Sequence, residues 1–133
     1  GLVACIESAA NHSATDYVEM RVRKLAYVEA IHRFFEEYDL LLTPAVSVAA
    51  FPADRLMPED WPEHPWDWVQ WAEFSYPFNM SHNPAASIPC GFTENGLPVG
   101  LQIVGPRMKD LEVLQASAAF EKAMPWADKI PQI

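Results

Sequence analysis

The stretch Pro84-Ala-Ala-Ser-Ile-Pro-Cys-Gly-Phe-Thr-Glu-Asn-Gly-Leu-Pro-Val-Gly-Leu-Gln-Ile-Val-Gly105 decides the fold, because two extended runs flank a turn. The runs cover residues 86–92 and 97–104, and the turn between them contains Asn-Gly, which supplies the positive φ angles of a tight hairpin turn. The pattern predicts an antiparallel hairpin over about 86–104. Pro89 has no N–H, so its strand is either at an edge or directs the proline nitrogen away from its neighbour.

A helix is expected on the C-terminal side of the hairpin, over about 110–123, with Asp110 as its cap and Pro125 ending it. Its apolar residues form two stripes on nearly opposite sides: Leu111, Leu114 and Ala118 on one, and Val113, Ala116, Phe120 and Met124 on the other. A helix with two apolar faces is typical of a buried layer in a larger protein. The alternative is that the long loop described next covers one face.

On the N-terminal side a longer helix is predicted over about 16–38, with Asp16 and Glu19 as a capping box. Its apolar stripe consists of Val18, Val22, Leu25, Val28, Ile31 and Phe35. A short buried strand over 40–43, stopped by Pro44, should follow. The Pro- and Trp-rich stretch over about 45–65 has no sustained period, which indicates a long surface loop. A short helix over about 66–74 completes the elements, and the alternative is an extension to Phe78 that Pro77 would interrupt.

Length and composition limit the protein to one domain over residues 1–133. The expected helices and strands together indicate an α/β mixture of elements. The net charge of −9 disfavours nucleic acid and anionic membrane surfaces as partners. No apolar run approaches the roughly 18–20 residues that span a bilayer. The two cysteines are far apart in sequence and indicate no disulfide framework, so we expect a cytoplasmic location. Gly1 in place of Met is consistent with a removed tag or an absent upstream portion.

None of the candidate reactive residues forms a recognisable catalytic or metal-binding set. The four histidines are scattered, and none is spaced to share a metal with another ligand, so neither a metal site nor a cofactor is expected. Cys90 precedes Gly91 at the end of a strand, and we interpret it as a small core residue. A less favoured hypothesis is a small cysteine hydrolase that uses Cys90 as its nucleophile. The serines near the hairpin lack a nucleophile elbow and a nearby Lys.

Four tryptophans between Trp61 and Trp71 provide either an aromatic wall for an apolar substrate or a cover for the core. An interfacial membrane helix would carry Lys or Arg on its polar face, and residues 58–74 contain neither.

Four pieces taken in order, Tyr38–Pro44, Phe78–Asn79, Asn83–Gly91 and Gly96–Gly105, resemble the C-terminal part of the amidase-signature hydrolases. The resemblance covers roughly residues 16–126. It implies an α/β fold with a large mixed sheet enclosed by helices, and hydrolysis of a carboxamide through an acyl-enzyme. The serine nucleophile, second serine and lysine base of that family lie in or near a glycine- and serine-rich signature that this chain lacks. No catalytic residue is therefore carried over.

The resemblance also implies a substrate-binding role for the short helix and the turn after it. It maps the acyl side of the pocket onto Val69, Ala72 and Tyr76, with Asn79 at the turn. Relatives usually have Gly where this chain has Asn83, so a positive φ is expected there. The strand residue Gln102 is expected to bond to a neighbouring loop rather than to contact a ligand.

The leading hypothesis is that residues 1–133 form the C-terminal segment of a cytoplasmic amidase acting on a small-molecule amide, inactive in isolation. The alternative is a noncatalytic binding or interaction module derived from an amidase. Missing strands would leave apolar surface open, so self-association, or packing on the missing N-terminal portion, is expected.

Overall fold

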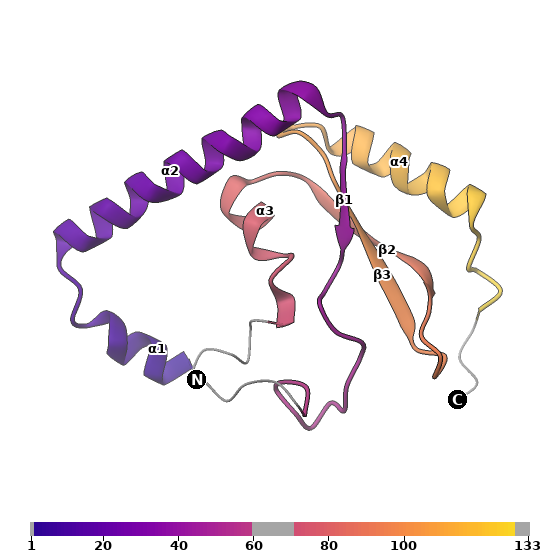
Figure 1. Ribbon diagram of the computed structural model, residues 1–133, viewed down its shortest axis with the longest axis horizontal. Helices are drawn as coiled ribbons and strands as arrows, with labels where there is room; N and C mark the ends of the chain where they lie inside the picture. The colour runs from indigo at the N-terminus through magenta and orange to yellow at the C-terminus, as the bar shows by residue number, and fades with distance from the viewer. Residues whose placement is uncertain (1, 60–70, 130–133) are drawn as a thin grey trace.

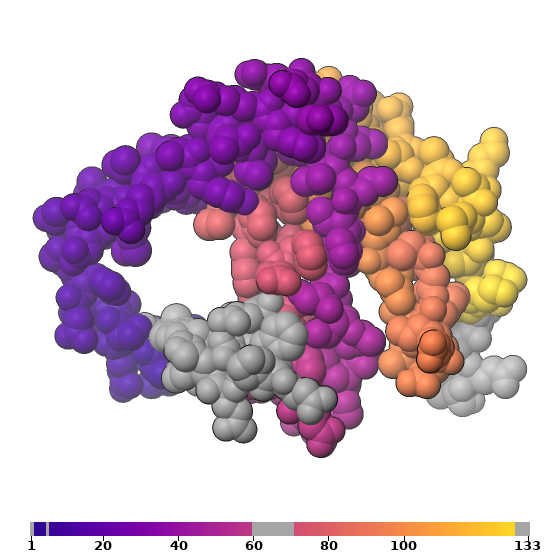
Figure 2. Space-filling view, in the orientation of Figure 1, coloured from indigo at the N-terminus to yellow at the C-terminus, as the bar shows by residue number. Residues whose placement is uncertain are grey.

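The fold is built on a small antiparallel sheet, seen in a computed structural model that describes residues 2–59 and 71–129. The elements in chain order are α1 (Leu2–Ala9), α2 (Ala14–Glu37), β1 (Leu41–Pro44), α3 (Tyr76–Ser81), β2 (Ala85–Phe92), β3 (Pro98–Val104) and α4 (Asp110–Ala123). The strand order is β1-β3-β2, and both pairs are antiparallel. In Figure 1, α4 lies beside the sheet, whereas α2 extends away from it, and α1, which precedes α2 in the chain, lies at the far end of α2. The molecule therefore has the shape of an open arch (Figure 2).

The predicted hairpin is confirmed, with a different turn. The Thr93 N–H donates to the Leu97 carbonyl at 2.8 Å, and the Gly96 N–H donates to the Thr93 carbonyl at 2.9 Å. Gly96 has a φ of 79°, and Asn95 has no positive φ. The connection is therefore a three-residue loop that needs one left-handed residue, whereas the expectation from Asn-Gly was of more than one.

Pro89 meets both of its expected conditions. β2 is an edge strand, and Pro89 lies opposite Gly100. The Gly100 carbonyl accepts from Ala45 on the β1 side. Because the N–H and C=O of one residue in an antiparallel strand point the same way, Gly100 offers nothing to β2 here. The Pro89 nitrogen therefore faces the outer edge, and the register shift between Pro89 and Gly91 disrupts the strand further.

The core lies between α4 and the sheet. Val113 of α4 is buried against Ile88 and Ile103, and partly buried apolar residues surround these three: Leu40, Ala86, Leu101, Ala116, Phe120 and Trp126. On one of the two predicted apolar stripes of this helix, Val113, Ala116 and Phe120 are thus covered, whereas Met124 is 53% exposed. On the other stripe Leu111 and Leu114 are 64% and 61% exposed, so the described residues leave that face open.

The bounds of α4 agree with the prediction, but its cap does not. Lys109 occupies the N-cap position, no side chain caps the helix, and Asp110 is the first helical residue. The Lys109 ammonium instead donates to Glu112 at 2.7 Å, which raises the pKa of Lys109 and lowers that of Glu112. The acidic first turn suits the positive end of the helix dipole.

α2 begins two residues before the predicted start, because the capping box is formed by Ser13 and Asp16 rather than by Asp16 and Glu19. The Asp16 N–H donates to the Ser13 hydroxyl at 3.1 Å, and the Ser13 N–H donates to the Asp16 carboxylate at 2.7 Å. No helix was expected over Leu2–Ala9, where α1 occurs.

The apolar stripe of α2 is open at its N-terminal half. Val18, Val22 and Leu25 are 58%, 60% and 66% exposed, whereas Val28, Ile31 and Phe35 are half-buried toward the sheet end. α2 packs against α3. Along its first turns α2 therefore has a capping box but no described tertiary partner.

The predicted strand over 40–43 is confirmed with a shift of one residue, as β1. Residues 45–59 form no helix or strand, as expected of the loop, and residues 60–65 lie outside the described part. Pro77 lies in the first turn of α3, where its fixed φ is favourable and no N–H is needed. It therefore starts a helix rather than interrupting one. Of the helix predicted over 66–74, residues 71–72 belong to a 3₁₀ helix, residues 73–74 form a turn, and the rest lies outside the described residues.

Candidate substrate-binding site

Gln102 joins the sheet to the segment that precedes α3. Its side-chain amide donates to the Thr43 hydroxyl at 2.9 Å and to the Phe74 carbonyl at 3.0 Å. Gln102 is buried, so both bonds form away from water. The expectation of a structural hydrogen bond to a neighbouring loop is confirmed, and the amide fixes the position of residue 74 relative to β1 and β3.

Asn83 acts through its side chain rather than through its backbone. Its amide donates to the Gly105 carbonyl at 2.8 Å, and the side chain is buried. The expected positive φ at Asn83 is wrong, because the left-handed residue is His82, with a φ of 59°, at the C-cap of α3. The left-handed backbone at His82 ends the helix, and the Asn83 side chain can therefore bond to the Gly105 carbonyl just after β3.

The four residues proposed from the resemblance lie in different surroundings. Val69 lies outside the described residues. Ala72 is half-buried in the turns before α3, and Tyr76 begins that helix. Asn79 is exposed on α3 and lines a small pocket of about 310 Å³ together with Phe78, His82, Asn83, Pro84, Met108 and Asp110. Neither Ala72 nor Tyr76 lines that pocket.

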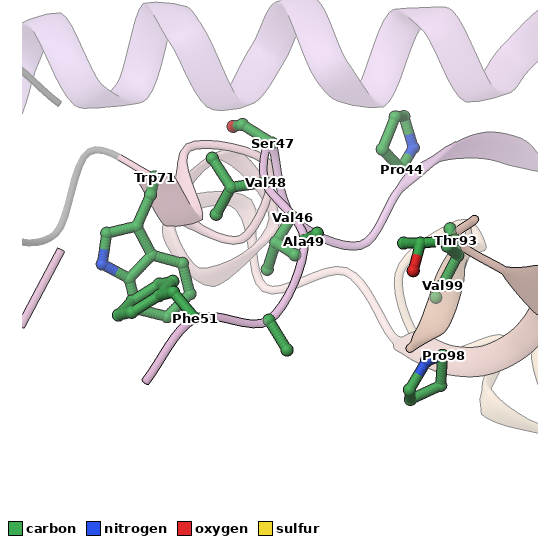
Figure 3. Close-up of a pocket in the computed structure, with 12 residues that line it drawn as sticks. Pro44, Val46, Ser47, Val48, Ala49, Phe51, Trp71, Thr93, Pro98 and Val99 are labelled. Carbon is green, nitrogen blue, oxygen red and sulfur yellow. The ribbon is translucent and has the colours of Figure 1, made fainter. Parts of the chain in front are cut away.

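A larger pocket of about 530 Å³ lies under the loop that follows β1. Its walls come from the loop, from Trp71 and from the turn end of the hairpin: Pro44, Val46, Ser47, Val48, Ala49, Ala50, Phe51, Trp71, Thr93, Pro98, Val99 and Gly100. Figure 3 shows Phe51 and Trp71 at one end, Pro98, Val99 and Thr93 at the other, and Val46, Val48 and Ala49 between them. Trp71 belongs to the group of tryptophans for which such a wall was considered, and the other three of that group lie outside the described residues.

Hydrogen bonds hold the loop against Trp71. The Ser47 N–H donates to the Trp71 carbonyl at 3.1 Å, and the Ser47 hydroxyl donates to Glu73 at 2.8 Å. The Trp71 indole N–H donates to the Leu56 carbonyl at 3.2 Å. The Phe51 and Trp71 rings meet edge to face, with centroids 5.4 Å apart. These bonds connect positions far apart in sequence, so no local pattern could have revealed the pocket.

The hairpin contributes a close approach at Gly100. A Cβ at this position would lie 2.9 Å from the Ala45 Cβ and 3.0 Å from the Ser87 hydroxyl. Neither neighbour is the end of a long flexible side chain, so a larger residue would displace the loop that roofs the pocket.

The remaining candidates take structural positions. Cys90 is half-buried, and its thiol lies 3.5 Å from the Val99 carbonyl. The Ser81 hydroxyl donates to the Pro77 carbonyl within α3. Within residues 2–59 and 71–129, no group of three His, Cys, Asp or Glu side chains is arranged to hold a metal ion. Among the helices in those ranges, none is long and apolar enough to cross a membrane.

Comparison with known proteins identifies the family. The family model described as Amidase matches residues 3–114. The chain belongs to the amidase family. It is 42% identical to the acylamidase of Rhodococcus erythropolis over 104 residues, covering 74% of this chain and 21% of that protein. It is 32% identical over 117 residues to a glutamyl-tRNA(Gln) amidotransferase subunit of Halothermothrix orenii, covering 88% and 23%. This amidase-family chain thus spans less than a quarter of these two relatives.

Solved structures agree on the fold. A bacterial aryl acylamidase of the amidase-signature family is 30% identical with a TM-score of 0.77, covering 95% of this chain and 26% of that one. A 6-aminohexanoate cyclic dimer hydrolase is 28% identical with a TM-score of 0.81, covering 96% and 28%. The α/β arrangement of this amidase-family segment is therefore that of the corresponding part of the amidase-signature fold, as the resemblance implied.

Proposed function

We propose that this chain is the C-terminal segment of an enzyme that hydrolyses the carbon–nitrogen bond of a small carboxamide. The identity of 42% to an acylamidase over 74% of the chain carries the proposal. The family match over residues 3–114 supports it.

Amide cleavage requires an activated nucleophile, a proton donor for the departing amine and hydrogen-bond donors facing the oxyanion. The resemblance implies that a Ser-Ser-Lys set supplies the nucleophile and base. In our proposal that set belongs to polypeptide outside residues 1–133, in a cytoplasmic enzyme. This segment then acts as one structural domain that contributes strands, the α4 cover and part of the substrate wall.

The part of the wall that we propose consists of Val69, Ala72, Tyr76 and Asn79. Two hydrogen bonds support a fixed position for its centre, because Trp71 is bonded to Ser47 and Phe74 is bonded to Gln102, on either side of Ala72. A backbone held at both ends presents its side chains with little loss of conformational freedom on binding.

A segment exchange tests the proposal. The matching segment of the Rhodococcus acylamidase is replaced by the corresponding residues of this chain, and hydrolysis of acetanilide is measured beside the parent acylamidase. We expect the chimera to retain turnover and the isolated chain to have none. A chimera that folds, as circular dichroism shows, and binds acetanilide without hydrolysing it would support the noncatalytic module instead. Turnover by the isolated chain that a serine-directed reagent abolishes would contradict the division of roles.

A further inference from the structure

The pocket under the loop over residues 45–51 has the size and lining of a small-molecule site. Its volume of about 530 Å³ lies in the range of roughly 300–1,000 Å³ that is usual for such sites. The twelve lining residues that the structure describes are uncharged, and most are apolar. These twelve side chains therefore offer no counter-charge to an ionised group placed inside the pocket.

The polar groups at the rim are bonded to the protein itself. The Ser47 hydroxyl donates to Glu73, and the Thr93 hydroxyl accepts from the Leu97 N–H at 3.0 Å. The indole N–H of Trp71 is directed to the Leu56 carbonyl. What these groups leave for a ligand is largely hydrocarbon and aromatic surface, which favours an apolar group and disfavours an ion that would lose its hydration.

The aromatic end of the pocket is pre-shaped. Phe51 and Trp71 meet edge to face at an interplanar angle of 86°. The Ser47–Trp71 and Trp71–Leu56 hydrogen bonds hold the tryptophan from two sides. A third ring placed beside this pair gains the edge or offset contacts that aromatic groups prefer. Little ordering of the pocket is then needed on binding.

The pocket and the proposed substrate wall are connected in sequence. Trp71 lines the pocket and directly precedes Ala72 of the wall. We propose that this pocket binds the uncharged apolar part of the amide substrate, an aromatic ring or short alkyl chain, while the amide group lies toward the wall. This assignment rests on the proposed amidase function.

Binding to the full chain provides the direct test. Acetanilide is the probe, and 4-acetamidobenzoate, which adds a carboxylate to the same ring, is the charged comparison; dissociation constants are measured by isothermal titration calorimetry. The Ala49→Phe variant fills the pocket, and Leu114→Phe places the same side chain on the exposed face of α4 as a matched control. We expect Ala49→Phe to weaken acetanilide binding by about tenfold or more, equivalent to about 1.4 kcal/mol. Leu114→Phe should bind like the unaltered chain, and 4-acetamidobenzoate should bind more weakly than acetanilide.

Equal acetanilide affinity in Ala49→Phe and the unaltered chain, or equal affinity for the two probes, would overturn the assignment. If Ala49→Phe does not fold, Val46→Lys at a partly exposed lining position replaces it, with the same expected loss.

The chimera separates the two proposals. Ala49→Phe in the chimera should raise the KM for acetanilide more than the KM for acetamide, which lacks a large apolar group. Hydrolysis with an unaltered KM would reject the pocket and keep the amidase function. Pocket binding with an inactive, folded chimera would reject the function, and with it the assignment of the bound group as part of a substrate.

Discussion

Among the buried polar side chains described in the site, Gln102 makes two hydrogen bonds, whereas Ser81 and Asn83 donate one each. Its amide supplies donors to Thr43 and to the Phe74 carbonyl, neither of which lies next to it in sequence. Gln102→Leu keeps the volume but removes both bonds, so we expect the free energy of unfolding to fall by about 1–3 kcal/mol. Urea denaturation measures this. Gln115→Leu on an exposed face of α4 is the control, because Leu and Gln have similar helix propensities. Equal midpoints for the two variants would show that the two bonds contribute nothing.

Asp16 gives α2 a pH-dependent start. The Ser13 hydroxyl and the Ser13 N–H bond to its carboxylate, which lowers the pKa of Asp16 below its ordinary value near 3.8. The carboxylate therefore stabilises the fold above that value, and the contribution is lost as pH falls through the lowered folded-state pKa. In Ser13→Ala we expect the pKa of Asp16 to rise toward the ordinary value. NMR titration of the carboxyl carbon measures this, with Thr15→Ala as the control. An unchanged pKa in Ser13→Ala would show that the capping box does not set it.

The residues that sequence reasoning placed correctly were those with one strong requirement. A buried amide must find partners, so the role of Gln102 followed from its place in a strand. Asn83 had two ways to satisfy its chemistry, a left-handed backbone or a side-chain bond, and the bond to Gly105 was the one that formed. The pocket around Trp71 could not be predicted, since it depends on contacts between distant loops.

At the scale of elements, the hairpin and α4 were predictable because single residues, a glycine in the turn and a proline after the helix, restrict or permit the backbone conformation locally. Proline ends α4, and Gly96 permits the turn, whatever the remainder of the fold does. The start of α2 was displaced because two overlapping capping patterns, Ser13 with Asp16 and Asp16 with Glu19, were available, and the structure forms the first. α1 was missed because it is short and has no side-chain signal at its start.

The hairpin turn offers a clean test of backbone conformation. A Cβ on Gly96 would meet nothing within 4 Å, so Gly96→Ala changes only the conformational energy at a φ of 79°. A left-handed non-glycine residue costs about 1–2 kcal/mol. We expect thermal unfolding to show a loss of that size, whereas Glu94→Ala in the same loop should be nearly neutral. A stability of Gly96→Ala equal to that of the unaltered chain would mean that the turn adopts another conformation.

At the scale of the whole molecule, apolar surface is left open on several helices. Leu2, Val3 and Ile6 of α1 are exposed, as is the N-terminal half of the α2 stripe. Exposed apolar patches of this kind promote association. We expect the isolated chain to form dimers or larger assemblies, with a mass in light scattering that rises with concentration. A monomer over a wide concentration range would contradict this.

Two double variants localise the association. Val22→Gln with Leu25→Gln removes apolar groups from the open face of α2 and should shift the mass toward the monomer. Glu19→Gln with Arg23→Gln removes one charge of each sign from the same helix and should not. A similar shift in both would attribute association to charge rather than to apolar contact.

The outward-facing nitrogen of Pro89 limits how copies of this sheet can pair edge to edge. A growing cross-β fibril needs donors and acceptors on both edges of every unit. β2 lacks a donor at its centre and is bent there by the register shift, so a further strand cannot extend along it. Of the three strands that the structure describes, β1 alone keeps an edge open to pairing. A ladder with one usable side terminates once two copies have joined. Large particles of this chain should therefore be amorphous and bind little thioflavin T.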